Sequence, residues 1–393
     1  MKTISKLLII GIVLLIAAGC APAATPVATP TAAATTMPAT TVPPATIAPT
    51  ATQVPPTAAT AATPIPPTAT LAPGQRELTV MTHDSFNASD DVIAEFEKAN
   101  NVRIRILKSG DAGAAVNKAI LTKNNPLADM FYGVDNTFLS RALNADIFVP
   151  YQAKGLEKIP ARFKLDAANR AIPIDYGDVC LNYDKAWFKQ RSLTPPATLD
   201  DLTKPTYKNL LVVENPATSS PGLAFLFSTI AQFGQDKYLT YWKQLRDNNV
   251  LISDGWEDAY YGKSTWAGKG DRPIVVSYAT SPAAEVFFNN MKEPPTGNVL
   301  GENACFRQIE FAAVLRGAKN PELAQRFIDY MVSLRFQEDV PGQMFVFPVL
   351  PDAKLPDYYK FAEQPAKPAS LTAEQIDANR DKWISAWTST VLR

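Results

Sequence analysis

The 393-residue sequence contains one histidine, His83, and three cysteines, Cys20, Cys180 and Cys305. So few His and Cys side chains exclude metal sites that need several ligands of these two types. The sequence also lacks a Gly-x-Ser-x-Gly motif, and one imidazole leaves few ways to build a Ser-His-acid site. We therefore expect no resident metal. We also predict no catalytic residue and no cofactor.

The N-terminus has the layout of a secretory signal. Lys2 and Lys6 flank the start of an apolar run, which is too short to cross a membrane comfortably and ends in small residues. Ala17-Ala18-Gly19-Cys20 resembles a bacterial lipobox, whose cysteine receives diacylglycerol and becomes the new N-terminus; an ordinary buried cysteine is the alternative. We predict a lipoprotein signal peptide over residues 1–19 and a lipid anchor on Cys20 at the outer face of the cytoplasmic membrane.

Residues 21–73 lack charge altogether. Thirteen of these 53 residues are proline, and the others are small, apolar or uncharged. Such a segment has no periodic apolar face to bury, and its prolines favour extended conformations. We predict a disordered linker over residues 20–74, followed by a globular part of about 320 residues, which is long enough for two lobes.

The chain also lacks an excess of charge of either sign. Without the two lysines of the predicted signal, 36 Lys and Arg residues face 38 Asp and Glu residues. Nucleic-acid binding requires a basic surface, so we expect no nucleic-acid partner. We expect a monomer.

In the globular part, short apolar strand patterns alternate with amphipathic helix patterns. Strands are predicted over residues 78–81, 102–107, 128–133, 210–214 and 274–278, and helices over residues 89–96, 113–122 and 223–233. The repeated order strand, helix, strand implies right-handed crossovers and a mostly parallel sheet. The fold class is therefore predicted to be α/β.

Two further strand patterns, over residues 179–183 and 305–311, stand between the α/β regions. We interpret them as a two-strand hinge that joins lobe 1 (75–178 and 306–393) to lobe 2 (179–305). Cys180 and Cys305 lie in these strands. Because disulfides persist in exported proteins, a bond between the two is favoured; two separate buried thiols are the alternative.

Polar and aromatic residues follow several of the predicted strands. In parallel α/β folds, ligands bind at the carboxyl ends of strands, near helix N-termini. The residues at such positions are His83, Asp84, Ser85, Asp135, Asp175, Tyr176, Ser219, Ser220, Tyr278 and Ser281. Together they are predicted to surround a cleft between the lobes.

Two of these stretches favour particular ligands. Ser219-Ser220-Pro221-Gly222 begins a helix with free N–H groups and hydroxyls, which suits a phosphate; simple capping is the alternative. Trp256 stands among acids and tyrosines in residues 255–261, and this composition suits a flat cation. Packing of Trp256 in the core is the alternative.

A series of motifs, in order and spacing, resembles thiamine-binding proteins of bacterial ABC importers over nearly the whole globular part. The motifs are His83-Asp-Ser-Phe86, Val134-Asp-Asn136, Pro173-Ile-Asp-Tyr-Gly177, Thr218-Ser-Ser-Pro-Gly222, Gly255-Trp256, Ser277-Tyr-Ala-Thr-Ser-Pro282 and Asp381-Lys-Trp-Ile-Ser-Ala-Trp387. The resemblance implies a two-lobed, type II periplasmic-binding-protein-like fold. It also implies delivery of thiamine to a membrane permease with its ATPase.

The resemblance assigns a role to several residues. Trp256 and Tyr278 would stack on the rings of thiamine, and the serine pair 219–220 would meet its phosphate or hydroxyethyl end. Asp84 and Asp175 would contact the aminopyrimidine or balance the thiazolium charge. The sequence departs from the family at two positions: His83 replaces a frequent tyrosine, and Phe345 stands near a position that can be tryptophan.

Two other functions compete with this one. A receptor of the same fold could instead bind ferric iron or another small organic cation. A ferric-ion receptor would use adjacent tyrosines, and Tyr260-Tyr261 offers such a pair. An exported thiamine-degrading or phosphate-ester-processing enzyme would need a nucleophile such as a free cysteine.

Overall fold

The computed structural model describes Leu71, residues 74–267 and residues 270–393. These residues belong to one compact unit. The predicted signal peptide, Cys20 and nearly all of the predicted linker lie outside the described residues. Within the part of the chain that the structure describes, no helix is both long enough and apolar enough to span a membrane.

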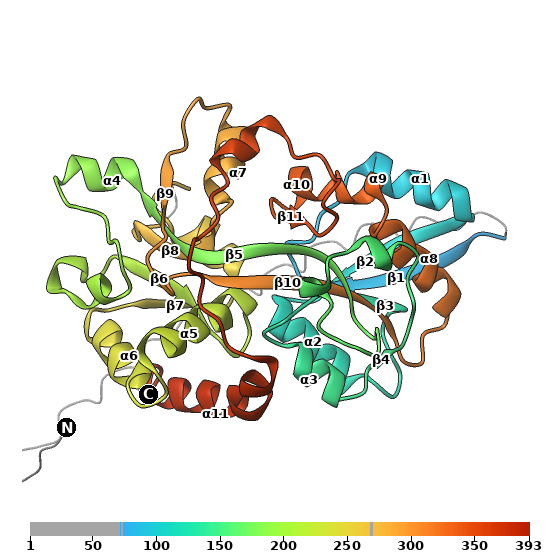
Figure 1. Cartoon of the computed structure of the whole chain (residues 1–393), viewed down its shortest axis with the longest axis horizontal. Helices are drawn as coiled ribbons and strands as arrows, with labels where there is room; N and C mark the ends of the chain where they lie inside the picture. The colour runs from blue at the N-terminus through green and yellow to red at the C-terminus, as the bar shows by residue number, and fades with distance from the viewer. Residues whose placement is uncertain (1–70, 72–73, 268–269) are drawn as a thin grey trace, which may run out of the picture. The chain divides into compact units, whose positions relative to one another are not determined.

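Strands and helices alternate along this unit (Figure 1). The strands are β1 (Arg76–Thr82), β2 (Val102–Lys108), β3 (Met130–Asp135), β4 (Phe148–Val149), β5 (Ile172–Asp184), β6 (Leu211–Glu214), β7 (Leu251–Ser253), β8 (Ile274–Tyr278), β9 (Thr296–Val299), β10 (Phe306–Leu315) and β11 (Phe347–Pro348). The α-helices are α1 (Asp90–Asn100), α2 (Ala112–Leu121), α3 (Leu139–Asn144), α4 (Lys185–Gln190), α5 (Ser220–Phe233), α6 (Tyr238–Asp247), α7 (Ser281–Asn289), α8 (Pro321–Met331), α9 (Leu334–Gln337), α10 (Val340–Gln343) and α11 (Ala373–Val391). Short turns of other helix types are η1 (Leu156–Lys158), η2 (Ala161–Phe163), η3 (Asp200–Thr203), η4 (Pro205–Tyr207), η5 (Asp258–Lys263) and η6 (Asp357–Phe361).

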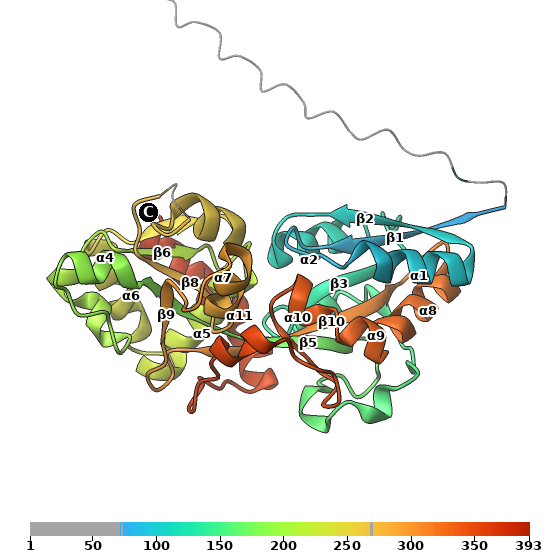
Figure 2. The same cartoon turned by 90° about the horizontal axis from the view of Figure 1, so that it is seen from above.

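The strands form one sheet with the order β2-β1-β3-β10-β5-β8-β6-β7. Strands β1, β2 and β3 pair in parallel in one lobe, and β6, β7 and β8 pair in parallel in the other. Strands β5 and β10 run between the lobes and pair antiparallel with each other and with their outer neighbours. Figure 2 shows the two lobes on either side of these crossing strands.

The crossing strands are longer than the sequence patterns predict. Strand β5 begins at Ile172 rather than at Val179, because Pro173 and Asp175 interrupt the apolar pattern from which a strand is recognised. Val179 of β5 pairs with Phe306 of β10. Cys180, which follows Val179, and Cys305, which precedes Phe306, are joined in a disulfide with their Cα atoms 4.4 Å apart.

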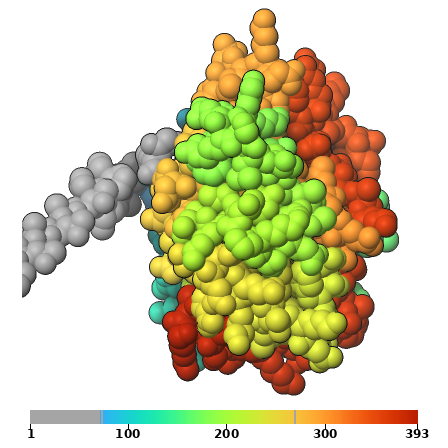
Figure 3. Space-filling model, turned by 90° about the vertical axis from the view of Figure 1, so that its left-hand side faces the viewer, coloured from blue at the N-terminus to red at the C-terminus, as the bar shows by residue number. Residues whose placement is uncertain are grey.

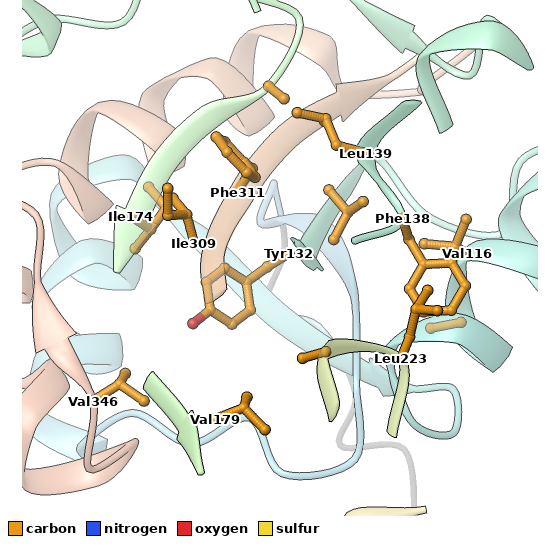
Figure 4. Close-up of a cluster of buried hydrophobic side chains, with 14 of the residues drawn as sticks. Val116, Tyr132, Phe138, Leu139, Ile174, Val179, Leu223, Ile309, Phe311 and Val346 are labelled. Carbon is orange, nitrogen blue, oxygen red and sulfur yellow. The ribbon is translucent and has the colours of Figure 1, made fainter. Parts of the chain in front are cut away.

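The hydrophobic core continues from the crossing strands into both lobes. Figure 4 shows Tyr132 of β3 among apolar side chains, including Ile309 and Phe311 of β10, with its hydroxyl directed away from them. In the same view Leu223 of α5 lies beside Phe138. Apolar packing therefore brings the N-terminus of α5 against the other lobe.

The C-terminal helix α11 packs at the end of the molecule that carries α6. The rings of Trp387 on α11 and Trp242 on α6 lie 5.4 Å apart, edge to face, and α11 also contacts α3. In Figure 3 the red C-terminal segment borders the yellow segment that contains α6. Helix α11 thus touches both lobes, and the predicted lobe boundaries stay predictions.

Candidate functional site

Three carboxyl groups lie side by side where β3, β10 and β5 run next to each other. Glu310 of β10 is in register with Asp135 of β3 and with Asp175 of β5. All three residues are buried. The register of β10 shifts against β5 directly after Glu310 and against β3 after Phe311, and such irregularities re-aim side chains. We call Asp135, Glu310 and Asp175 the acid row.

The members of the acid row differ in their affinity for a proton. Burial raises the pKa of Asp135 to about 7, and the charge of Glu310 adds to the rise. Burial also raises the pKa of Asp175 well above its ordinary value, again with help from Glu310. For Glu310 itself, burial is outweighed by His83, whose charge and hydrogen bond lower the pKa. Near neutral pH the row therefore holds one ionised carboxylate between two acids that retain protons more readily.

His83 is the cationic partner of this row. Its Nε2 lies 3.2 Å from Oε1 of Glu310, and both side chains are about nine-tenths buried. Burial opposes protonation of the imidazole, but Glu310, with Asp111 and Asp84, raises its pKa. Gly133 leaves room for the ring, since a Cβ atom at this position would lie 2.2 Å from Cδ2 of His83. The single histidine of the chain is thus held in an ion pair inside the site.

Gln308 connects the acid row to the other lobe. Its side-chain nitrogen lies 2.6 Å from Oδ2 of Asp135 and 2.6 Å from Oγ of Ser220, and donates to both. Its side-chain oxygen accepts a hydrogen bond of 2.7 Å from the hydroxyl of Tyr278. Ser220 begins α5 and Tyr278 ends β8, so one carboxamide holds two strand-end groups against the acid row.

Asp111 makes a second connection between the lobes. As the N-cap of α2, it accepts a hydrogen bond from the N–H of Ala112, and its other oxygen accepts one of 2.9 Å from the backbone N–H of Trp256. Ser219, which caps α5 by accepting a bond from the N–H of Gly222, also donates to Asp111. Burial raises the pKa of Asp111, although these bonds oppose the rise.

The ring of Trp256 lies in an aromatic group beside these contacts. It stacks on Tyr260 with ring centroids 4.9 Å apart, and it meets Tyr278 edge to face at 6.2 Å. Its indole N–H donates to Oγ of Ser277 over 2.8 Å, and Ser281 lies 3.0 Å from that hydroxyl. Trp256 and Tyr278 are only partly buried, and the Tyr278 hydroxyl is linked to Asp135 of the acid row through Gln308.

Asp84 and Ser85 lie in the loop that follows β1. The Asp84 carboxylate accepts a hydrogen bond of 2.9 Å from the N–H of Gly110, just after β2. Ser85 donates over 3.4 Å to the exposed carboxylate of Glu257, beside Trp256. Ser85 therefore faces the other lobe from the edge of the site.

Two predicted residues point elsewhere. Tyr176 follows Asp175 on β5 and so faces the opposite side of the strand, where it stacks between Phe163 and Phe347 at 4.7 and 5.3 Å. Phe345 belongs to a separate aromatic group, 4.8 Å from Phe288 of α7. The geometry does not join either ring to the acid row, and the ligand-binding roles expected of Tyr176 and Phe345 stay predictions.

Sequence reasoning missed residues that the structure places in or beside the site, namely Asp111, Tyr132, Glu214, Gln308 and Glu310. Asp111 and Glu214 stand at strand ends, so the strand-end rule could have found both. Glu310 and Gln308 lie within a crossing strand, and no local pattern shows which residues of β3 and β5 they oppose.

The contacts do not favour the competing functions. The Tyr260 hydroxyl donates to the buried carboxyl of Glu285 over 2.5 Å, whereas Tyr261 is 45% exposed. Among the described residues, no group of three or more His, Cys, Asp or Glu is arranged to hold a metal ion. Cys180 and Cys305 are bonded to each other and are not free thiols.

A cavity of about 740 Å³ lies apart from these residues. Its lining combines basic and apolar side chains from α1, η1, α8 and neighbouring loops, among them Phe96, Lys158, Arg326, Tyr330 and Leu350. None of the residues predicted for the site lines it.

Comparisons with known proteins agree with this architecture. A family model described as bacterial extracellular solute-binding protein matches residues 125–367. A thiamine-binding periplasmic protein of Salmonella typhimurium is 32% identical over 321 residues, covering 80% of this chain and 94% of the relative. A thiamine-binding periplasmic protein of Escherichia coli is 30% identical over 321 residues, which cover 80% of this chain and 94% of that relative.

A solved structure of a periplasmic thiamin binding protein aligns with a TM-score of 0.72. The two sequences are 28% identical, and the alignment covers 81% of this chain and 96% of that one. This similarity confirms the predicted fold class, a two-lobed α/β fold of the type II periplasmic-binding-protein kind.

Proposed function

Because the chain belongs to the bacterial extracellular solute-binding protein family, we propose that it captures thiamine or a thiamine phosphate between its lobes. The observation that carries this proposal is that two partly exposed rings adjoin each other, Trp256 and Tyr278, and that the Tyr278 hydroxyl is linked to the buried acid row through Gln308. Flat ring faces next to carboxylates suit a flat organic cation such as thiamine. The names of the relatives support the same ligand.

Within this proposal the site residues divide by ligand group. Trp256 and Tyr278 stack on the rings, and the acid row balances the thiazolium charge. Asp84 and Asp175 are available to the aminopyrimidine, and the serine pair 219–220 faces the phosphate or hydroxyethyl end. No bond of the ligand is broken, and no cofactor takes part.

Binding is coupled to closure of the lobes about β5 and β10. Groups from both lobes already meet, as in the bond from the N–H of Trp256 to Asp111. A ligand that touches both sides adds contacts that only the closed state offers, and so shifts the population toward closure. The closed, loaded protein is then the form that a permease and its ATPase recognise.

We place the protein outside the cytoplasmic membrane. Diacylglycerol on Cys20 anchors it, and the Pro-rich linker holds the globular part near the permease as a monomer. The proposed lobes comprise residues 75–178 with 306–393, and residues 179–305.

Calorimetric titration of the purified chain with thiamine, its mono- and diphosphate and the free pyrimidine tests this function. We expect sub-micromolar binding of thiamine, weakened at least about tenfold by Trp256→Ala through loss of stacking. Trp187→Ala removes a partly buried indole from α4, outside the candidate site, and serves as the matched control. Absence of binding to every compound would refute the ligand assignment.

A further inference from the structure

Glu285 of α7 is a buried acid that holds the aromatic ring behind Trp256. The Tyr260 hydroxyl donates to Oε1 of Glu285 over 2.5 Å, and the Thr296 hydroxyl donates to Oε2. Glu285 and Tyr260 are each only 6% exposed. Buried polar groups need such partners, and here both carboxyl oxygens have one. The Tyr260 ring is therefore fixed at its hydroxyl end.

The Tyr260 ring in turn supports the ring of Trp256. The two rings stack with their centroids 4.9 Å apart and their planes 20° apart, and Trp256 is only partly buried. Tyr260 also belongs to a small apolar cluster with Val212 of β6 and Val275 of β8. A ring packed on two strands and bonded to Glu285 gives the indole of Trp256 a fixed support.

The turn that joins the two rings has an unusual backbone. Trp256 precedes η5 and Tyr260 lies within it, and η5 has the wide π-helical form. Turns of this form are rare and are frequently found at functional sites. The hydrogen bond from Tyr260 to Glu285 ties this irregular turn to α7, so the support of the indole is anchored outside the turn itself.

We propose that Glu285 is a positioning residue for ligand binding, which acts through Tyr260 to hold the Trp256 ring where the ligand meets it. This inference rests on the proposed function and deepens it, since Trp256 is the proposed stacking surface. Burial raises the pKa of Glu285 to about 7, but a carboxyl group keeps an acceptor oxygen in either protonation state. Burial also raises the pKa of Tyr260 well above its ordinary value, so the phenol keeps its proton and remains the donor.

Tyr260→Phe and Glu285→Leu test this role, because each removes one partner of the bond and keeps a side chain of similar size. Calorimetry of the full chain should show thiamine binding weakened at least about threefold in each variant, because a loosely held ring must be ordered when the ligand binds. The double variant should bind no more weakly than the weaker single variant, since both changes remove the same bond. Near-ultraviolet circular dichroism of the unliganded chain reports fixed aromatic packing. The contribution of Trp256, measured as the difference that Trp256→Phe makes in each background, should decrease in both variants.

Tyr241→Phe is the matched control. It removes the hydroxyl of another buried tyrosine, which donates to the carbonyl oxygen of Leu199 over 3.0 Å, and should change neither the affinity nor the contribution of Trp256. Wild-type affinity or an unchanged Trp256 contribution in either Tyr260→Phe or Glu285→Leu would overturn the inference while leaving the proposed function intact. Additive losses in the double variant would also overturn it. A wild-type chain that does not bind thiamine would instead refute the proposed function, and the dichroism of the unliganded chains would still show whether Glu285 fixes Trp256.

Discussion

The imidazole of His83 and the carboxylate of Glu310 form a buried ion pair, with Nε2 of one 3.2 Å from Oε1 of the other. The pair joins the end of β1 to the centre of β10, two strands that are separated in the sheet by β3. It places one positive charge beside three acids and thereby determines which of them is ionised.

The pair should stabilise the fold in a defined pH range. Because its pKa is raised in the folded state, His83 stabilises the fold at pH values below 6.5. This contribution is lost as pH rises through the folded-state pKa of His83. Because its pKa is lowered in the folded state, Glu310 stabilises the fold at pH values above 4.5. This contribution is lost as pH falls through the folded-state pKa of Glu310. Both contributions are therefore present between pH 4.5 and 6.5.

His83→Phe keeps a ring against Tyr132 but removes the charge. We expect it to lower the free energy of unfolding at pH 5.5 by about 3 kcal/mol, since it leaves a buried carboxylate unpaired, and by less at pH 9. Urea unfolding at the two pH values measures the difference. In the double variant with Glu310→Gln the loss should be smaller than the sum of the single losses; a loss independent of pH would contradict this prediction.

Binding of a cation should release protons from the acid row. Burial raises the pKa of Asp135 to about 7, and a cation nearby favours the ionised form. The affinity for thiamine should consequently increase roughly tenfold between pH 6 and pH 8. Calorimetry in two buffers of different ionisation enthalpy measures both the affinity and the proton release. Asp135→Asn should make the affinity for thiamine less dependent on pH. Equal affinities of the wild-type chain at pH 6 and pH 8 would contradict the predicted proton release.

Closure of the lobes should depend on Gly113 of α2. A Cβ atom at this position would lie 2.7 Å from the carbonyl oxygen of Thr218, which precedes α5 in the other lobe, and 2.7 Å from Cζ of Phe138. Gly113→Ala should favour the helix but hold the lobes apart. We expect thiamine binding to weaken at least about tenfold and the radius of gyration in X-ray scattering to increase.

The matched control for closure is Gly342→Ala in α10. The nearest atom to a Cβ atom there is 3.7 Å away, an ordinary contact, so neither quantity should change. If Gly113→Ala bound thiamine as tightly as the wild type, the contact between α2 and the α5 turn would not be required for closure.

The disulfide should stabilise the hinge. Cys180 and Cys305 are 125 residues apart in the sequence, so the bond closes a long loop in the unfolded chain. Replacement of both by alanine should lower the free energy of unfolding by about 2–5 kcal/mol, as measured by urea denaturation. The wild-type chain with its disulfide reduced should unfold at a similar urea concentration. Equal stability of the oxidised and reduced chains would disprove this role.

Local sequence patterns predicted the strands and helices near the site well. Strand 274–278 was predicted with its observed limits, and strand 102–107 differs from β2 by one residue. Strand ends followed by polar residues also identified His83, Asp135 and Ser220, because chain direction alone determines which end of a parallel strand carries the site.

Local patterns could not predict which residues on different strands lie opposite each other. Glu310 opposes Asp175 only through the register of β5 and β10, which depends on residues far apart in the chain. The ion pair of His83 follows from the same register. Tyr176 was grouped with Asp175 although neighbouring residues of a strand face opposite sides.

A crystal structure of the chain with bound thiamine is the most direct test of the central claim. We predict thiamine between the lobes, with its rings against Trp256 and Tyr278 and its hydroxyethyl end at the serine pair 219–220. Thiamine bound instead in the cavity between Lys158 and Arg326, or absent from between the lobes at saturating concentration, would contradict this proposal.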